Sequence, residues 1–188
     1  MKTALLLIDI QNDYFPGGRM ELDGSQPASL RAKDILTLFR DRNLPVFHIQ
    51  HISNRKGALF FLPDTAGVEI HANVSPLPGE TIIQKNFPNS FRNTDLLTRL
   101  KETGVCKLVI CGMMTHMCVD ATVRAAFDHG FDCVAIHDAC ATRGLAFNGV
   151  EIPSEKVHGA FLAALGAVYA RVCSSEEFAA QIDSTAQD

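Results

Sequence analysis

The 188-residue chain lacks an excess of positive charge, a long apolar run and any C-x-x-C pair of cysteines. Its 17 lysines and arginines against 21 aspartates and glutamates give a formal net charge of −4, so we expect no nucleic-acid partner. The longest nearly uncharged stretch, residues 157–170, is shorter than the roughly 20 apolar residues that a membrane-crossing helix needs. We therefore expect no membrane partner either.

The six cysteines, at positions 106, 111, 118, 133, 140 and 173, do not have the spacing of the usual zinc-ribbon or thioredoxin-like motifs. The apolar run that follows Lys2 spans about six residues and ends at Asp9, which is short for a secretory signal. We therefore expect a cytoplasmic protein whose thiols are reduced and whose first apolar run is a buried strand.

Apolar residues form 47% of the chain and charged residues 20%, which is ample for a packed core in one domain spanning residues 1–188. Short apolar runs alternate with longer amphipathic stretches. Strands are predicted at residues 4–8, 45–50, 81–84, 107–111, 132–137 and 167–173, and helices at 27–42, 94–104, 115–130, 153–165 and from Ser175 onward. This alternation predicts a three-layer Rossmann-like α/β domain, with a six-stranded, mostly parallel sheet covered by helices on both faces.

Residues 52–80 form a long stretch with several glycines and prolines and almost no periodicity. Loops of this length without regular structure are usually lids or binding loops, so we expect this segment to cover a binding site or to contact another subunit. Phe60 and Phe61 lie near its centre and are expected to be exposed, as an apolar pair that needs a partner surface.

Ligands of such sheets bind beyond the carboxyl ends of the strands, near the point where the strand order reverses. Asp9 directly follows the first predicted strand, Lys85 follows the third, and Cys118 follows the fourth. If Thr115 caps the helix after that strand, Cys118 lies in its first turn, where free N–H groups and the helix dipole lower the pKa of a thiol. Each residue alone fits a solvated charge or a buried, inert cysteine, but together they predict an activated thiol nucleophile.

Three separated segments resemble the isochorismatase-like cysteine hydrolases, namely LIDIQNDYF at 7–15, KNFPNSF at 85–91 and GMMTHMCV at 112–119. This family includes nicotinamidases and N-carbamoylsarcosine amidases. The resemblance spans nearly the whole chain and implies a Rossmann-like fold, the catalytic triad Asp9, Lys85 and Cys118, and a homo-oligomer. It also implies an oxyanion hole formed by the backbone N–H groups of Met114 and Cys118, next to a cis peptide bond between Met113 and Met114.

What the resemblance implies for the reaction depends on Cys118. The isochorismatase branch lacks this nucleophile, so its presence favours a cysteine-dependent hydrolase that cleaves a small non-peptide amide or related C–N bond through a thioester. The nicotinamidase branch is the alternative, and it carries a metal site after the second strand, built from an aspartate and several histidines. Here His48 and His51 lack the Asp-x-His element and the next histidine is His71, so we expect neither a metal nor another cofactor. We interpret these histidines as structural or solvated.

Aromatic side chains next to the triad are the candidates for contacts with a small-molecule substrate. Tyr14 closely follows the first triad residue, and Phe87 and Phe91 follow the second, whereas Phe15 is expected to pack in the core. Two functions of another class stay open at this point. One is a thiol redox sensor, for which Cys111 or Cys140 would have to act as the resolving thiol, and the other is non-catalytic binding of a small molecule.

Overall fold

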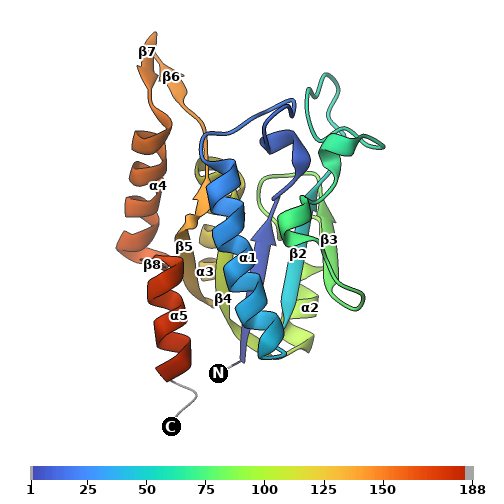
Figure 1. The fold of residues 1–188 in the computed structure, drawn as a ribbon, viewed down its shortest axis with the longest axis vertical. Coiled ribbons are helices and arrows are strands. Elements are labelled where there is room, and N and C mark those ends of the chain that lie inside the picture. The colour runs from blue at the N-terminus through green and yellow to red at the C-terminus, as the bar shows by residue number, and fades with distance from the viewer. Residues whose placement is uncertain (1, 185–188) are drawn as a thin grey trace.

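The computed structural model describes residues 2–184, and its centre is a six-stranded sheet (Figure 1). The strands of this sheet are β1 (Lys2–Ile8), β2 (Val46–His51), β3 (Thr81–Lys85), β4 (Val105–Met113), β5 (Asp132–Ala141) and β8 (Arg171–Cys173). Their order is β3-β2-β1-β4-β5-β8, and every neighbouring pair is parallel. The predicted α/β fold with a parallel six-stranded sheet is therefore confirmed, whereas residues 1 and 185–188 of the predicted domain lie outside the described part.

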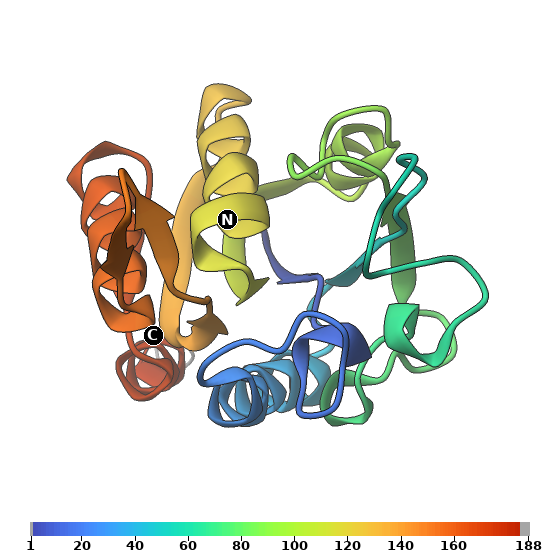
Figure 2. The ribbon, with the colours of Figure 1, turned by 90° about the horizontal axis from the view of Figure 1, so that it is seen from above.

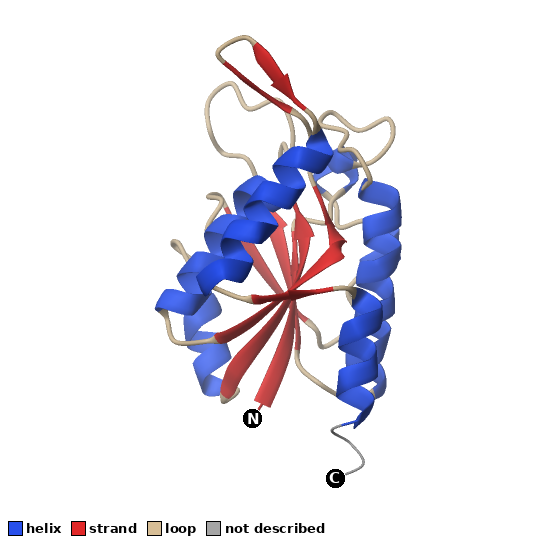
Figure 3. Cartoon of the chain, turned by 90° about the vertical axis from the view of Figure 1, so that its left-hand side faces the viewer, coloured by secondary structure: helices blue, strands red, loops and turns tan. Residues whose placement is uncertain are grey.

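Helices cover both faces of the sheet, which gives three layers (Figure 3). They are α1 (Ser25–Asp41), α2 (Leu96–Glu102), α3 (Asp120–Asp128), α4 (Ser154–Val168) and α5 (Ser175–Ser184). Residues of α1 and α5 share a core with one face of the sheet, and residues of α2, α3 and α4 share a second core with the other face. In the part of the chain that the structure describes, no helix has the length and apolar character needed to cross a membrane.

Strand β1 is the central strand and is buried on both of its faces. Leu5 and Leu7 belong to the core beneath α1, while Leu6 and Ile8 belong to the core beneath α2 and α3. From β1 the chain winds through β2 and β3 toward one edge, and from β4 through β5 and β8 toward the other (Figure 2). The reversal between β1 and β4 is the point at which open α/β sheets bind ligands, beyond the carboxyl ends of these strands.

The turn between β4 and α3 differs from the predicted helix start. Instead of an α-helix capped by Thr115, the chain forms a π-helical turn at Thr115–Val119, preceded by Met114, and α3 follows it. The Thr115 hydroxyl lies 3.2 Å from the backbone oxygen of Ala141 and 2.9 Å from Nδ1 of His158, so it does not cap the helix. Such π-helical turns are frequent at functional sites, and this one holds the cysteine of the predicted triad.

Two further differences from the predicted elements lie in the C-terminal part. Strand β8 is shorter than the predicted strand at 167–173, because α4 continues to Val168. A two-stranded hairpin, β6 (Leu145–Phe147) and β7 (Val150–Ile152), projects beyond the end of the sheet and was not predicted (Figures 1 and 3). Its turn is Asn148-Gly149, and both residues have positive φ, as a type I′ turn requires.

The segment 52–80 is irregular apart from two single 3-10 turns, as predicted. The buried carboxylate of Asp13 anchors it, because the backbone N–H of Phe61 donates to Oδ2 at 2.6 Å. Gly67 approaches the same carboxylate so closely that a Cβ there would lie 2.1 Å from Oδ1. Phe61 is fully buried and its ring centroid lies 4.6 Å from that of Tyr14, so the expectation that Phe61 is exposed is wrong.

Candidate active site

The ends of β1 and β3 and the turn after β4 bring Asp9, Lys85 and Cys118 together. Asp9 is the first residue after β1 and has a left-handed backbone with a φ of 50°. Lys85 is the last residue of β3, and its Nζ lies 2.8 Å from Oδ2 of Asp9. A carboxylate oxygen of Asp9 and Sγ of Cys118 lie within 4.8 Å of each other. All three residues are buried, so the structure places the predicted residues in one enclosed cluster.

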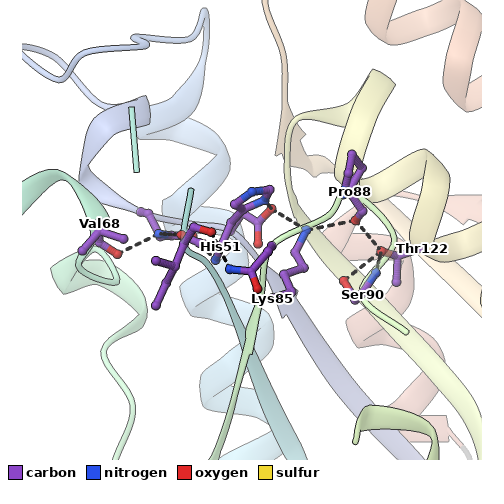
Figure 4. Close-up of polar contacts among 10 residues, drawn as sticks. His51, Val68, Lys85, Pro88, Ser90 and Thr122 are labelled. Carbon is purple, nitrogen blue, oxygen red and sulfur yellow. Dashed lines mark hydrogen bonds and ion pairs between the residues drawn. The ribbon is translucent and has the colours of Figure 1, made fainter. Parts of the chain in front are cut away.

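Three neighbours surround the ammonium group of Lys85, and Figure 4 shows one of them, the backbone oxygen of Pro88. It donates to the backbone oxygen of Pro88 at 2.9 Å, pairs with Asp9 and interacts with the thiol of Cys118. The Pro88 segment is anchored to α3, because the backbone N–H of Ser90 donates to Oγ1 of Thr122 at 3.1 Å. The carboxylate, carbonyl and thiol match the three N–H donors of a lysine, so the position of this ammonium is well determined.

Burial and neighbouring charges shift the pKa values of Asp9 and Lys85 in opposite directions. Burial raises the pKa of Asp9, but the Lys85 ammonium and His51 more than offset this effect, so the Asp9 pKa lies below its ordinary value. Burial lowers the pKa of Lys85, but the charges of Asp9 and Cys118 more than offset it and raise the Lys85 pKa. At neutral pH the pair is therefore a carboxylate and an ammonium, and Asp9 is able to accept a proton.

The thiol of Cys118 is protonated at neutral pH, which differs from the expectation drawn from the sequence. Burial raises its pKa, the carboxylate of Asp9 raises it further, and Lys85 offsets these effects only in part. The expected lowering of this pKa is therefore wrong, because the effect of a helix start is outweighed by enclosure beside a carboxylate. Such a thiol needs a base that takes its proton during nucleophilic attack, and Asp9 lies where that base is needed.

This protonation state has a measurable consequence for the chemical modification of Cys118. We expect its alkylation by iodoacetamide to accelerate about tenfold per pH unit from about pH 6 to 9, because the reactive thiolate is a small fraction throughout this range. The measurement is the modified fraction of the peptide that contains Cys118, by mass spectrometry. A rate that already levels off near pH 7 would show a resting thiolate and contradict this expectation.

His51 belongs to the same cluster. It is the last residue of β2 and lies beside Lys85 in the register of β2 and β3. Its Nδ1 is 3.8 Å from Oδ2 of Asp9, and its side chain is 16% exposed. Nothing in the sequence indicated that His51, interpreted as structural or solvated, lies beside Asp9. The three-residue spacing of His48 and His51 indicates that their side chains leave the strand on opposite faces. It does not indicate which of the two lies near Asp9 and Lys85.

A cavity of about 340 Å³ reaches Cys118, and this volume is within the range of small-molecule sites. Its lining consists of Tyr14, His51, Ser53, Asn54, Arg55, Ala58, Phe60, Asn86, Phe87, Pro88, Met114, Met117 and Cys118. Five of these residues come from the segment 52–80, so this loop forms part of the cavity wall. Its predicted place at a binding site agrees with this geometry.

Of the three aromatic side chains predicted to contact a substrate, Tyr14 and Phe87 line the cavity and Phe91 does not. Phe91 is a core residue whose ring centroid lies 5.0 Å from that of His129 and 6.2 Å from that of Phe131. The prediction for Phe91 is therefore corrected, because the preceding segment is anchored to α3 and directs this residue into the core. Burial raises the pKa of Tyr14 well above its ordinary value, so its phenol stays neutral beside the cluster.

The backbone donors that the resemblance assigns to an oxyanion hole belong to Met114 and Cys118, and both residues line the cavity. The peptide bond between Met113 and Met114 is cis, as the resemblance implies. Gly112 precedes this bond with a φ of 143°, and a Cβ there would lie 2.1 Å from the backbone oxygen of Ile8. Only glycine therefore lets the end of β4 approach the end of β1 this closely.

The cluster does not favour a bound metal ion. Among the residues that the structure describes, Asp9, His51 and Cys118 have donor atoms within 4.8 Å of one another, close enough to surround a small cation. A cation there would compete with the Lys85 ammonium, which already neutralises Asp9 at 2.8 Å. The buried His48 is not part of this group of donor atoms, and its Nε2 lies 2.9 Å from Oε2 of Glu80. We therefore assign no metal to these residues.

The chain is similar to known proteins over most of its length. The profile of the isochorismatase domain matches residues 3–177 of the chain. The isochorismatase family protein YddQ of Bacillus subtilis is 54% identical over 178 residues, which cover 95% of this chain and 99% of that protein. Streptothricin hydrolase of Streptomyces noursei is 34% identical over 139 residues, which cover 74% of this chain and 54% of that protein.

A solved structure shows the same similarity in three dimensions. The crystal structure of an isochorismatase hydrolase from Oleispira antarctica superposes with a TM-score of 0.91 and 46% sequence identity, covering 95% of this chain and 96% of that one. The match of the domain profile extends over nearly all of the residues that form the sheet and its helices. The chain therefore belongs to the isochorismatase family of hydrolases.

Proposed function

We propose that the protein is a cysteine-dependent hydrolase that cleaves a small non-peptide amide, or a related C–N bond, through a thioester on Cys118. The observation that carries this proposal is the buried pair of Asp9 and Lys85 next to a thiol that lines a small-molecule cavity. The similarity to a streptothricin hydrolase supports hydrolytic chemistry.

In the first half of the reaction, Asp9 takes the thiol proton while Sγ of Cys118 attacks the carbonyl carbon. The carbonyl oxygen becomes an oxyanion that accepts hydrogen bonds from the backbone N–H groups of Met114 and Cys118, and one such donor is typically worth about 3–4 kcal/mol. As the C–N bond breaks, the proton on Asp9 passes to the leaving nitrogen. Lys85 keeps Asp9 ionised before and after this exchange, and water then hydrolyses the thioester.

The cavity favours a substrate with one anionic end. Within the described chain, Arg55 is the one permanently charged side chain among the lining residues, and none of them is an aspartate or glutamate. A second guanidinium, that of Arg92, lies 3.8 Å from the ring centroid of Phe87. Phe60 and Phe87 supply apolar wall to the same cavity. We therefore infer that the substrate is a small amide that carries a carboxylate.

The change Arg55→Gln tests this charge preference with two probes of similar size. We expect it to raise the KM for succinamate about tenfold and to leave the KM for butyramide unchanged, because only succinamate has a carboxylate for the guanidinium. The change Lys56→Gln, at an exposed neighbour outside the lining, is the matched control and should leave both values unchanged. An equal change of KM for both amides in Arg55→Gln would contradict the inference.

A hydrolysis screen tests the proposed function itself. The purified protein is incubated with nicotinamide, N-carbamoyl amino acids, ureides and simple amides, and the ammonia released is compared with that from the variant Cys118→Ala. Hydrolysis that depends on Cys118 supports the proposal, and preference for nicotinamide over the other compounds would favour the nicotinamidase alternative. If the wild type and Cys118→Ala release equal amounts of ammonia from every compound, the proposed function is contradicted.

No observation favours a thiol redox sensor over this proposal. Cys111 packs in the core on the other face of the sheet from Cys118, so it is poorly placed to act as a resolving thiol. Cys140 shares a core with Cys118, but it does not line the cavity that reaches Cys118. The raised pKa also keeps Cys118 in the protonated form, which is oxidised more slowly than a thiolate. The homo-oligomer that the resemblance implies stays a prediction, which light scattering in solution would check.

A further inference from the structure

We propose that His51 is a catalytic residue that activates water in the second half of the reaction, the hydrolysis of the thioester on Cys118. This inference rests on the proposed function and assigns a role to a side chain outside the predicted triad. Its ring nitrogen lies within 4.8 Å of both Sγ of Cys118 and a carboxylate oxygen of Asp9. A thioester carbon bonded to Sγ is therefore within reach of a water molecule held by this ring.

Exposure separates His51 from the other ionisable members of the cluster. The side chains of Asp9 and Lys85 are completely buried, whereas that of His51 is 16% exposed and lines the cavity. Once the amine has left, the water molecule must arrive through the cavity, because the other side of the cluster is closed. His51 is thus the base that an entering water meets, while Asp9 is buried beside the thiol and does not line the cavity.

The backbone of His51 is held firmly in place by a buried side chain. Gln11 is completely buried, and its Oε1 accepts from the backbone N–H of His51 at 2.8 Å. The Nε2 group of Gln11 donates to the backbone oxygen of His51 at 2.9 Å and to that of Val68 at 2.7 Å (Figure 4). A glutamine thus joins the end of β2 to the segment 52–80. Fixed positioning of this kind is what a proton-transfer residue requires.

The arrangement of charges around His51 suits a base that becomes transiently positive. Its Nδ1 is the nitrogen that approaches Asp9, at 3.8 Å, which leaves Nε2 to accept a proton from water. The carboxylate of Asp9 then stabilises the imidazolium, as a carboxylate does for the histidine of a hydrolase triad. Asp9 is available for this purpose because its own proton has already left with the amine.

The step balances without any further reactant. His51 accepts one proton from water while the water oxygen bonds to the thioester carbon, and the carbonyl oxygen becomes an oxyanion. When the carbonyl bond re-forms, the C–S bond breaks and the carboxylic acid is released. The proton taken up at Nε2 of His51 then passes to the thiolate of Cys118, which restores both the resting thiol and the starting form of the histidine.

The variant His51→Gln tests this role with 4-nitrophenyl acetate, an active ester whose nitrophenolate reports acylation. We expect a burst of about one equivalent of nitrophenolate, followed by a steady rate about 10²–10⁴ times lower than that of the wild type. Mass spectrometry should find the acetyl group on Cys118. Hydroxylamine, which attacks thioesters without a base, should restore the steady release in this variant. The burst itself would show that the variant is folded.

Matched controls separate this role from a structural one. The variant His129→Gln changes an exposed histidine at the end of α3 and should behave as the wild type does. The inference is overturned if His51→Gln keeps the steady rate of the wild type. It is equally overturned if both half-reactions slow together and no acetyl-enzyme accumulates. A wild-type protein that is never acetylated at Cys118 would instead contradict the proposed function, and this inference with it.

Discussion

Replacing Cys118 with alanine should lower kcat/KM for amide hydrolysis by about 10⁴-fold or more, because the variant has no sulfur to form the thioester. The expected residual activity comes from binding and from the backbone donors alone. The measurement is ammonia release from a substrate found in the screen, together with a thermal melt to show that the variant is folded. A small substitution at this position should be tolerated by the fold, since the side chain lines a cavity.

The variant Cys106→Ala is the matched control for this prediction. Cys106 is partly exposed and its thiol lies 3.6 Å from the backbone oxygen of Lys2, at the end of the sheet opposite to the cluster. The variant Cys106→Ala should keep the activity of the wild type. Retention of most activity by Cys118→Ala would show that the nucleophile is assigned to the wrong residue and would remove the basis of the proposed mechanism.

Replacing Lys85 with methionine should both destabilise the protein and abolish its activity. The variant leaves the Asp9 carboxylate buried without its partner, and breaking a buried pair in this way typically costs about 3–5 kcal/mol in the free energy of unfolding. Burial then dominates the pKa of Asp9 and raises it, so the thiol loses its proton acceptor near neutral pH. We expect at least a 10³-fold loss of kcat/KM, measured beside urea unfolding curves.

The difference in the free energy of unfolding between the wild type and Lys85→Met should change with pH in one direction. In the wild type the Asp9 pKa is lowered, so the stability that its ionised form contributes is lost as the pH falls through that pKa. In Lys85→Met the Asp9 pKa is raised, so folding takes up a proton and the variant gains stability as the pH falls. The difference in the free energy of unfolding between the two proteins should therefore become smaller from pH 7 toward about pH 4.

The exposed pair of Lys107 and Asp132, at 3.1 Å, provides the control for this experiment. The change Lys107→Met should cost at most about 1 kcal/mol, because both side chains are partly exposed to water, and it should leave activity unchanged. If the difference in the free energy of unfolding between the wild type and Lys85→Met stays constant with pH, the expected change in the Asp9 pKa is wrong.

Much of the fold was predictable because it depends on the order of apolar residues along the chain. The run at residues 4–8 is apolar at every position, and the structure buries it on both faces as the central strand β1. The hairpin β6–β7 was missed although its Asn148-Gly149 turn is a strong local signal. The end of α4 was misplaced because residues 167–170 carry no charge and form a short, mostly apolar run that fits either a strand or a helix.

The candidate site was predictable where a residue directly follows a strand, and less so elsewhere. Asp9 and Lys85 could be found because parallel strands end at one edge of the sheet. Phe91 follows Lys85 at six positions and Tyr14 follows Asp9 at five, yet Phe91 enters the core and Tyr14 lines the cavity. That difference depends on how the intervening segment is anchored to α3, through contacts between residues 32 positions apart.

Periodicity, turn residues and strand ends thus determined the layers, the parallel sheet and the edge at which polar side chains gather, because all of these follow from neighbours along the chain. Only the tertiary structure decided that His51 joins the cluster, that Arg55 reaches the cavity and that the Cys118 thiol is protonated. These properties arise from distances and burial among residues that are remote in sequence. A pKa in particular sums the desolvation and the charges around one atom, and folding alone brings those together.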